Sequence, residues 1–218
     1  SSDRGPYRSW YYRGETEGMS NSLNWLQTGI GLMKYVRPTD TNDDKNINGE
    51  FSHISKKADP LIRYADILLM YAEALNELDG SYQIETWDNS GTHSISRNED
   101  ELKKGVQPVR IRAGIPDFTP EEYGNKELFR KKIKRERQIE LMAEGQRYFD
   151  LRRWKTAEKD LNQPLMGFRI ERQDNGVVST HEFVVDGQRK FNTKMYYSPI
   201  PYSEMQLNTN LVQNPGWR

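Results

Sequence analysis

The densest group of side chains that could do chemistry is a cluster of arginines and carboxylates between residues 135 and 150. Two carboxylates whose pKa values differ could act as a general acid and a general base. Residues three and four apart on a helix are neighbours, however, so these charges are expected to pair with each other across helix turns. Two of them, Arg137 and Glu144, lie on the apolar face, where a charge is costly unless it is paired. We interpret the cluster as structural and expect no catalytic residue. Its members are Arg135, Glu136, Arg137, Glu140, Glu144, Arg147 and Asp150.

Few residues in the sequence suit histidine-based catalysis or metal binding. His53, His93 and His181 are the only histidines, and all three lie in polar sequence without a visible nucleophile, so a catalytic triad is not expected. The run at residues 40–46 alternates oxygen ligands suited to Ca²⁺, but Lys45 stands where an EF-hand loop needs glycine. A solvated loop is the favoured interpretation, and no metal or other cofactor is expected.

Helices are the main elements that would position these side chains. Apolar residues at helical spacing predict a helix over residues 59–80, with Asp59 as the N-cap and Pro60 at its first position. A second helix is predicted over residues 98–112, where Pro108 removes a backbone donor and should kink or shorten it. Small side chains should let a neighbouring helix approach the first one closely, namely Ala65, Ala72 and Ala74.

The second half of the chain contains further helices and then strands. A short turn is predicted at residues 119–122, the longest helix at 126–144 with Gly145 as its stop, and another helix at 147–159. Alternation then predicts strands at 168–171 and 182–185, with a turn at Asp186-Gly187. The tail from residue 196 should be extended and packed, with one helical turn near residues 203–206.

Two segments lack helical periodicity. Residues 1–58 are irregular although rich in aromatic side chains, and residues 81–97 are polar and turn-rich. The fold class predicted from these patterns is mainly helical with a small β element.

Composition limits the functional classes. The 218 residues contain 32 Lys plus Arg and 32 Asp plus Glu, so there is no electrostatic reason to expect nucleic acid or an acidic membrane surface as a partner. Aromatic residues make up 11% of the chain, which is enough to build a core despite the polar average. Cysteine is absent, which excludes disulfides, thiolate metal sites and a cysteine nucleophile.

Four stretches together resemble one known family in their order and spacing. They are Arg63 to Glu77 (RYADILLMYAEALNE), Arg110 to Pro116 (RIRAGIP), Arg135 to Trp154 (RERQIELMAEGQRYFDLRRW), and the tail with Ser198-Pro199-Ile200-Pro201, Glu204, Asn208 and Gln213-Asn214-Pro215-Gly216-Trp217. Over roughly residues 30–218 the chain resembles the C-terminal half of the SusD/RagB family of nutrient-binding outer-membrane lipoproteins. Pro108 departs from the family, which usually has an asparagine there. Trp154 and Trp217 lie inside the matching segments and are expected in the core.

The resemblance implies a SusD-like helical fold of TPR-like helix pairs with long loops. Residues 1–218 would form a C-terminal domain, with the family's N-terminal half and its lipoprotein cysteine absent from this sequence. The implied protein is surface-exposed on the cell outer membrane, where it rests on a SusC-like TonB-dependent transporter. A lipid anchor outside this chain would hold it at the membrane.

The resemblance also implies a non-catalytic function, the binding of oligosaccharides or other glycans for import. Members of this family hold sugars on exposed aromatic rings, because the C–H face of a sugar lies flat on an indole or phenol. Their location in loops favours Trp10, Tyr11, Tyr12 and Trp25, with Arg13, Asn21 and Asn24 as polar neighbours. Trp87, beside Asp88 and Asn89, is a further candidate. Alternatives are a peptide ligand or a purely transporter-docking scaffold, and less favoured is a glycoside hydrolase.

Overall fold

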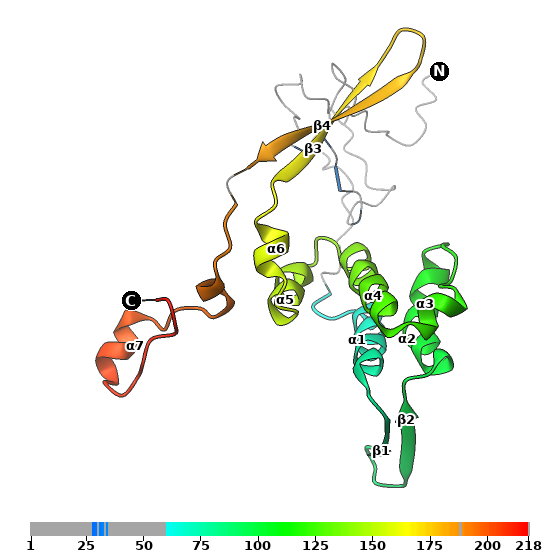
Figure 1. The fold of residues 1–218 in the computed structure, drawn as a ribbon, viewed down its shortest axis with the longest axis vertical. Helices are drawn as coiled ribbons and strands as arrows, with labels where there is room; N and C mark the ends of the chain where they lie inside the picture. The colour runs from blue at the N-terminus through cyan, green and yellow to red at the C-terminus, as the bar shows by residue number, and fades with distance from the viewer. Residues whose placement is uncertain (1–27, 30, 33, 35–59, 188, 218) are drawn as a thin grey trace, which may run out of the picture. The chain divides into compact units, whose positions relative to one another are not determined.

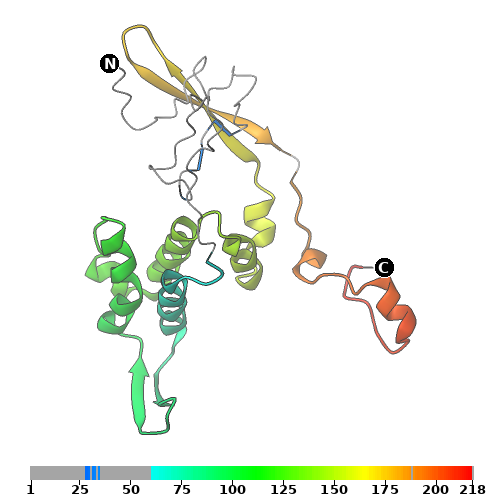
Figure 2. The same ribbon diagram turned by 180° about the vertical axis from the view of Figure 1, so that it is seen from behind.

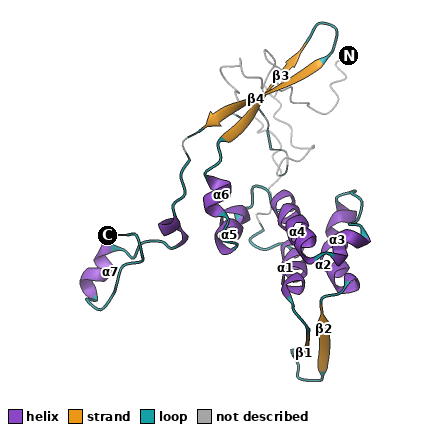
Figure 3. Cartoon of the chain, viewed as in Figure 1, coloured by secondary structure: helices purple, strands orange, loops and turns teal. Residues whose placement is uncertain are grey.

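The computed structural model describes residues 28, 29, 31, 32, 34, 60–187 and 189–217. Within these residues the chain is mainly helical, with two small two-stranded antiparallel sheets (Figure 3), which confirms the predicted fold class. It divides into two compact units. One is Asp59–Arg153, and the other combines Ser1–Ala58 with Trp154–Arg218. No helix among the described residues has the length and apolar character needed to cross a membrane.

Helix α1 (Tyr64–Glu77) is shorter than the sequence predicted. It begins at Tyr64 instead of near Asp59-Pro60, and the Leu61 side chain, which was expected on its apolar face, is 91% exposed. Arg63 explains the late start, because its backbone is extended and its guanidinium is held by Glu140 and Glu144 outside the helix. The helix ends before Gly80, where the Lys126 ammonium donates hydrogen bonds to the carbonyl oxygens of Glu77 and Leu78.

A β-hairpin follows α1 where the sequence analysis expected only polar turns. Strand β1 (Ser81–Glu85) pairs with β2 (Thr92–Ser96), so that Tyr82 lies opposite Ile95 and Ile84 lies opposite His93. The hairpin extends from the helices of its unit (Figure 1). His93 therefore lies in a strand, as does His181.

Helix α2 (Glu99–Arg112) begins after Asn98, whose side chain accepts a hydrogen bond from the Glu101 N–H as an N-cap. The helix continues through Pro108, so the predicted shortening is wrong. Its packing on α1 explains this, since Gly105 meets α1 so closely that a Cβ there would lie 2.7 Å from the Ala72 Cβ. Burial against a neighbouring helix offsets the hydrogen bond that proline removes. The close approach at Ala72 was expected.

Helices α3 (Pro120–Gly124) and α4 (Lys126–Glu140) complete the core of the first unit. Thr119 and Glu122 form a capping box at the start of α3, where the sequence predicted a short turn. Helices α1, α2, α3 and α4 lie together in both Figure 1 and Figure 2. The buried apolar core that they share consists of Ala65, Leu69, Ala72, Leu75, Leu102, Val106, Val109, Phe118, Tyr123, Phe129 and Ile133.

Two helix ends differ from the prediction. Helix α4 ends at Glu140 instead of Glu144, and the chain turns through Ala143 and Gly145, which both have positive φ. The helix predicted at residues 147–159 is divided into α5 (Gln146–Arg153) and α6 (Ala157–Leu161), because Lys155 adopts φ 57°. A left-handed backbone cannot continue a right-handed helix.

The second unit contains the predicted strands. Strand β3 (Leu165–Arg172) pairs with β4 (Val178–Asp186), and the turn between them is closed by the Gln173 N–H on the Val177 carbonyl. Strand β4 ends at Asp186 and the chain bends at Gly187, where a turn was predicted. The tail forms a 3₁₀ turn η1 (Thr193–Tyr196) and helix α7 (Tyr202–Leu207), close to the helical turn that was expected. Trp154 and Trp217 are only half-buried, so neither is in the fully buried core.

Candidate functional site

The tip of the β1–β2 hairpin presents Trp87 to solvent. The turn begins at Thr86, whose carbonyl accepts a hydrogen bond from the Asn89 N–H (2.9 Å), and Trp87 is the residue after Thr86. Its side chain is 96% exposed. The indole ring is thus available to a ligand on both faces.

Hydrogen bonds hold this turn in one shape. The Asp88 carboxylate accepts from the Ser90 N–H (3.1 Å) and the Ser90 hydroxyl (2.7 Å), and the Thr86 hydroxyl accepts from the Gly91 N–H (3.0 Å). Hydrogen bonds from Ser90, and then from Thr86, lower the pKa of Asp88 to about 2. Because the turn is tied internally, little conformational entropy would be lost when a ligand binds.

The chemistry of the tip suits a sugar. A large exposed indole can stack on the C–H face of a pyranose, and polar groups beside it can hydrogen-bond the ring hydroxyls. Asn89 follows in a left-handed conformation (φ 56°), and its side-chain amide has no hydrogen bond to another described residue. The tip therefore combines a stacking surface with an available amide.

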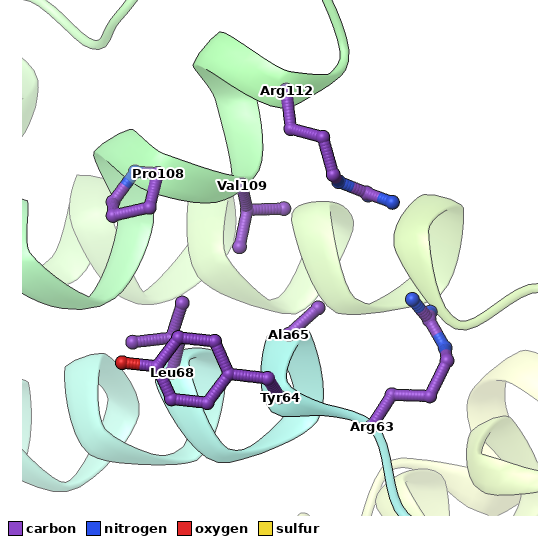
Figure 4. A pocket seen from close by; sticks show the side chains of 7 residues that line it. All are labelled: Arg63, Tyr64, Ala65, Leu68, Pro108, Val109 and Arg112. Carbon is purple, nitrogen blue, oxygen red and sulfur yellow. The ribbon is translucent and has the colours of Figure 1, made fainter. Parts of the chain in front are cut away.

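A shallow pocket of about 370 Å³ lies at the N-terminal end of α1, against α2 (Figure 4). Its walls are mostly apolar, and the Tyr64 ring at its mouth is 75% exposed. Two guanidinium groups, those of Arg63 and Arg112, lie at one end. The residues that line it are Arg63, Tyr64, Ala65, Leu68, Pro108, Val109 and Arg112.

The charges at this pocket are already neutralised. Arg63 donates to Glu144 (2.8 and 2.7 Å) and to the Glu140 carboxylate (2.9 Å), and Arg112 lies 2.5 Å from Glu140. The hydrogen bond to Glu144 is the largest cause that raises the pKa of Arg63 above its ordinary value. Since two carboxylates face two guanidinium groups, the pocket favours an apolar group over an anion.

The charged cluster at residues 135–150 is a set of ion pairs between elements. Arg137, almost fully buried on α4, binds Asp66 of α1 at 2.8 Å and Asp150 of α5 at 2.9 and 3.1 Å. Glu136 pairs with Arg110, while Glu140 and Glu144 pair with Arg63. The structural interpretation is supported, but the predicted pairing along one helix is wrong for Arg137 and Glu136, because the partners shown for them come from other elements.

Of the predicted site residues, the structure places only Trp87. The others, Trp10, Tyr11, Tyr12, Arg13, Asn24 and Trp25, together with Asn21 and the run at residues 40–46, lie outside the described residues. The predicted site residues did not include Tyr82, Ile84 or Tyr64. The period-two alternation of residues 82–85 and 93–96 around Asn89-Ser90-Gly91 was the signal that could have identified the hairpin.

Comparison with known proteins identifies the family. The family model for the SusD family matches residues 5–217, and the chain therefore belongs to the SusD family. A relative named SusD-like protein P2, from Formosa agariphila, is 31% identical over 160 residues, which are 72% of this chain and 25% of that protein.

Solved structures agree with this assignment. A crystal structure of a SusD-like protein (BF3747) from Bacteroides fragilis has a TM-score of 0.53 at 29% identity, over 72% of this chain and 25% of that one. The structure of BT4246 has a TM-score of 0.57 at 28% identity, over 75% of this chain and 25% of that one. The chain thus spans about a quarter of the length of these relatives.

Proposed function

We propose that this protein binds oligosaccharides at the cell surface, without cleaving them, for import through a SusC-like TonB-dependent transporter of the outer membrane. Membership of the SusD family supports a nutrient- or glycan-binding role, since proteins of this family are generally non-catalytic binding proteins and typically surface lipoproteins. The observation in this chain that best supports it is the exposed indole of Trp87 on a hydrogen-bonded turn.

In this proposal Trp87 is one stacking surface of the glycan site. The Asn89 amide would hydrogen-bond sugar hydroxyls beside the ring, while Asp88 keeps the turn closed. Further rings would come from Trp10, Tyr11, Tyr12 and Trp25, with Arg13 and Asn24 as polar partners. These six remain predictions from the sequence.

Isothermal titration of the full-length protein against a panel of neutral oligosaccharides tests the proposal. Trp87→Ala should weaken binding by roughly 1–2 kcal/mol, about 5- to 30-fold, as expected when a central aromatic contact is truncated. Trp87→Tyr should retain much of the affinity, because a flat ring remains. The matched control is Tyr202→Ala, which removes an exposed ring from α7.

The variants also separate the alternatives. Unchanged affinity of Trp87→Ala would remove the hairpin tip from the site, and Trp10→Ala and Trp25→Ala then test the predicted N-terminal rings. If no glycan binds, the oligosaccharide proposal is wrong, and a peptide ligand or a transporter-docking role takes its place. Sugar cleavage that is lost on changing a single carboxylate would refute the non-catalytic part.

A further inference from the structure

The edges of the β1–β2 hairpin are uncovered in the part of the chain that the structure describes. All five residues of β1 are exposed. Among the described residues, the sheet consists of strands β1 and β2 alone. An uncovered strand edge offers a row of backbone N–H and C=O groups to any extended chain.

This hairpin has few of the features that usually protect such edges, and Glu85 is the one charged residue in its two strands. Neither strand contains Lys, Arg or Pro, and the register has no bulge. The other hairpin differs, because β3 has an irregularity between Leu165 and Met166, contains arginines, and has its Phe168 N–H bonded to the Thr28 carbonyl (2.9 Å). Charges, bulges and covering segments are the features by which proteins prevent edge pairing.

The register shows which backbone groups of β1 point outward. The Thr86 N–H donates to the Gly91 carbonyl (2.9 Å), so this pair is of the hydrogen-bonded kind. Hydrogen-bonded and non-hydrogen-bonded pairs alternate in an antiparallel ladder, so Ile84 and Tyr82 also bond to β2. The N–H and C=O groups of Gln83 and Glu85 therefore face away from β2.

The side chains around this edge indicate the apolar pattern and the charge of a complementary partner. Tyr82 and Ile84 lie on one face, 51% and 49% exposed, and would contact alternate apolar side chains of an added strand. From Gly80 to Ser96 the charged side chains are Glu85 and Asp88, with no lysine or arginine. The complementary partner is therefore basic.

We propose that the outer edge of β1 binds an extended basic polypeptide segment as an added antiparallel or parallel strand. Backbone hydrogen bonds to Gln83 and Glu85 would provide the register, and lysine or arginine side chains of the partner would lie beside Glu85 and Asp88. A glycan has no row of N–H and C=O groups at the two-residue spacing of a strand. This inference is independent of glycan binding at the Trp87 ring.

The test uses the full-length protein and two synthetic seven-residue peptides, one alternating lysine with valine and one with glutamate in place of lysine. Binding is measured by isothermal titration, and amide hydrogen exchange is followed residue by residue by NMR. The basic peptide should bind and slow exchange at the Gln83 and Glu85 amides, while the acidic peptide should not bind. Equal binding of both peptides, or binding without protection of these two amides, would overturn the proposal.

Two proline variants separate the two edges. Gln83→Pro removes an outward donor from β1 and should weaken binding of the basic peptide roughly tenfold, through one lost backbone hydrogen bond and a bulky ring at the edge. Ser94→Pro places proline opposite, on the outer edge of β2, and should leave binding unchanged. The reverse result would refute the assignment to β1.

Glu85→Lys provides a test that leaves the backbone intact. This substitution should weaken binding of the basic peptide and strengthen binding of the acidic peptide, because it reverses the charge beside the edge. If the preference between the two peptides does not change, the electrostatic part of the proposal is wrong.

Discussion

Arg137 is a buried cation that joins three helices of the helical unit, and Arg137→Ala tests how much this contributes to stability. Its guanidinium makes three hydrogen bonds of 2.8 to 3.1 Å to Asp66 and Asp150, with only 2% of the side chain exposed. These bonds join α4 to α1 and α5. Removing the guanidinium leaves two carboxylates, both almost fully buried, without their shared cation.

The expected loss can be worked from the partners that remain. Breaking a buried ion pair by removing one partner costs about 3–5 kcal/mol, because the other charge stays buried and uncompensated. Asp150 keeps Arg153 at 2.9 Å, whereas among the described residues Arg137 is the one ion-pair partner of Asp66. We therefore expect the free energy of unfolding to fall by about 3–4 kcal/mol, mainly through Asp66.

Urea unfolding followed by ellipticity at 222 nm measures this loss, since the signal comes mainly from the helices. The matched control is Arg130→Ala on the same helix, whose partners Glu77 and Glu127 are at the surface. Such exposed pairs contribute about 0–1 kcal/mol each. In the Arg137→Ala background, Asp66→Ala should regain part of the stability, because it removes the uncompensated charge.

A loss below about 1 kcal/mol for Arg137→Ala, equal to that of Arg130→Ala, would refute this reasoning. It would mean that water reaches Asp66 when the arginine is removed. Failure of Asp66→Ala to regain stability would show that the cost comes from lost packing of the arginine side chain.

Two further predictions concern the contacts of α1. Gly105→Ala should destabilise the protein by about 1–3 kcal/mol in the same urea assay, because the new Cβ would lie 2.6 Å from the Leu68 carbonyl oxygen. Gly124→Ala, which meets nothing within 4 Å, is its control, and equal effects would contradict the proposed close packing. Burial, with the hydrogen bond to Glu101, raises the pKa of Tyr71 to about 12. Since an unfolded tyrosine ionises near 10, this contribution to stability is complete below about pH 10 and is lost as the pH rises towards 12. Tyr71→Phe should make stability less dependent on pH in this range, and an absorbance titration at 295 nm with every tyrosine ionising near pH 10 would contradict the assignment.

The period of apolar residues was sufficient to find the helices but not their ends. The middle of α1, α2 and α4 was predicted because apolar residues three and four positions apart in the sequence form one face of a helix. The start of α1 was not, because Arg63 is held by Glu140 and Glu144, 77 and 81 residues further along the chain. The division between α5 and α6 depends on the conformation of one residue, Lys155, which has no local sequence signal such as glycine.

The candidate site was only partly visible in the sequence. Trp87 was selected because it is an aromatic ring in a polar segment, beside Asp88 and Asn89, and the structure shows it exposed at a hairpin tip. The hairpin itself was missed, since its apolar residues, Tyr82, Ile84 and Ile95, are too few to stand out from the polar residues around them. Whether such residues form a loop or a ladder depends on the partner strand.

By itself, the sequence determined the helical class, the family and the structural interpretation of the arginine–carboxylate cluster, because periodicity, motif order and residue type are local properties. The tertiary structure decided which charges meet. Arg137 pairs with Asp66 across 71 residues, and Arg110 pairs with Glu136 across 26. Such partners are selected when helices pack and water is removed from between them, and that step has no signature in the spacing of residues along one helix.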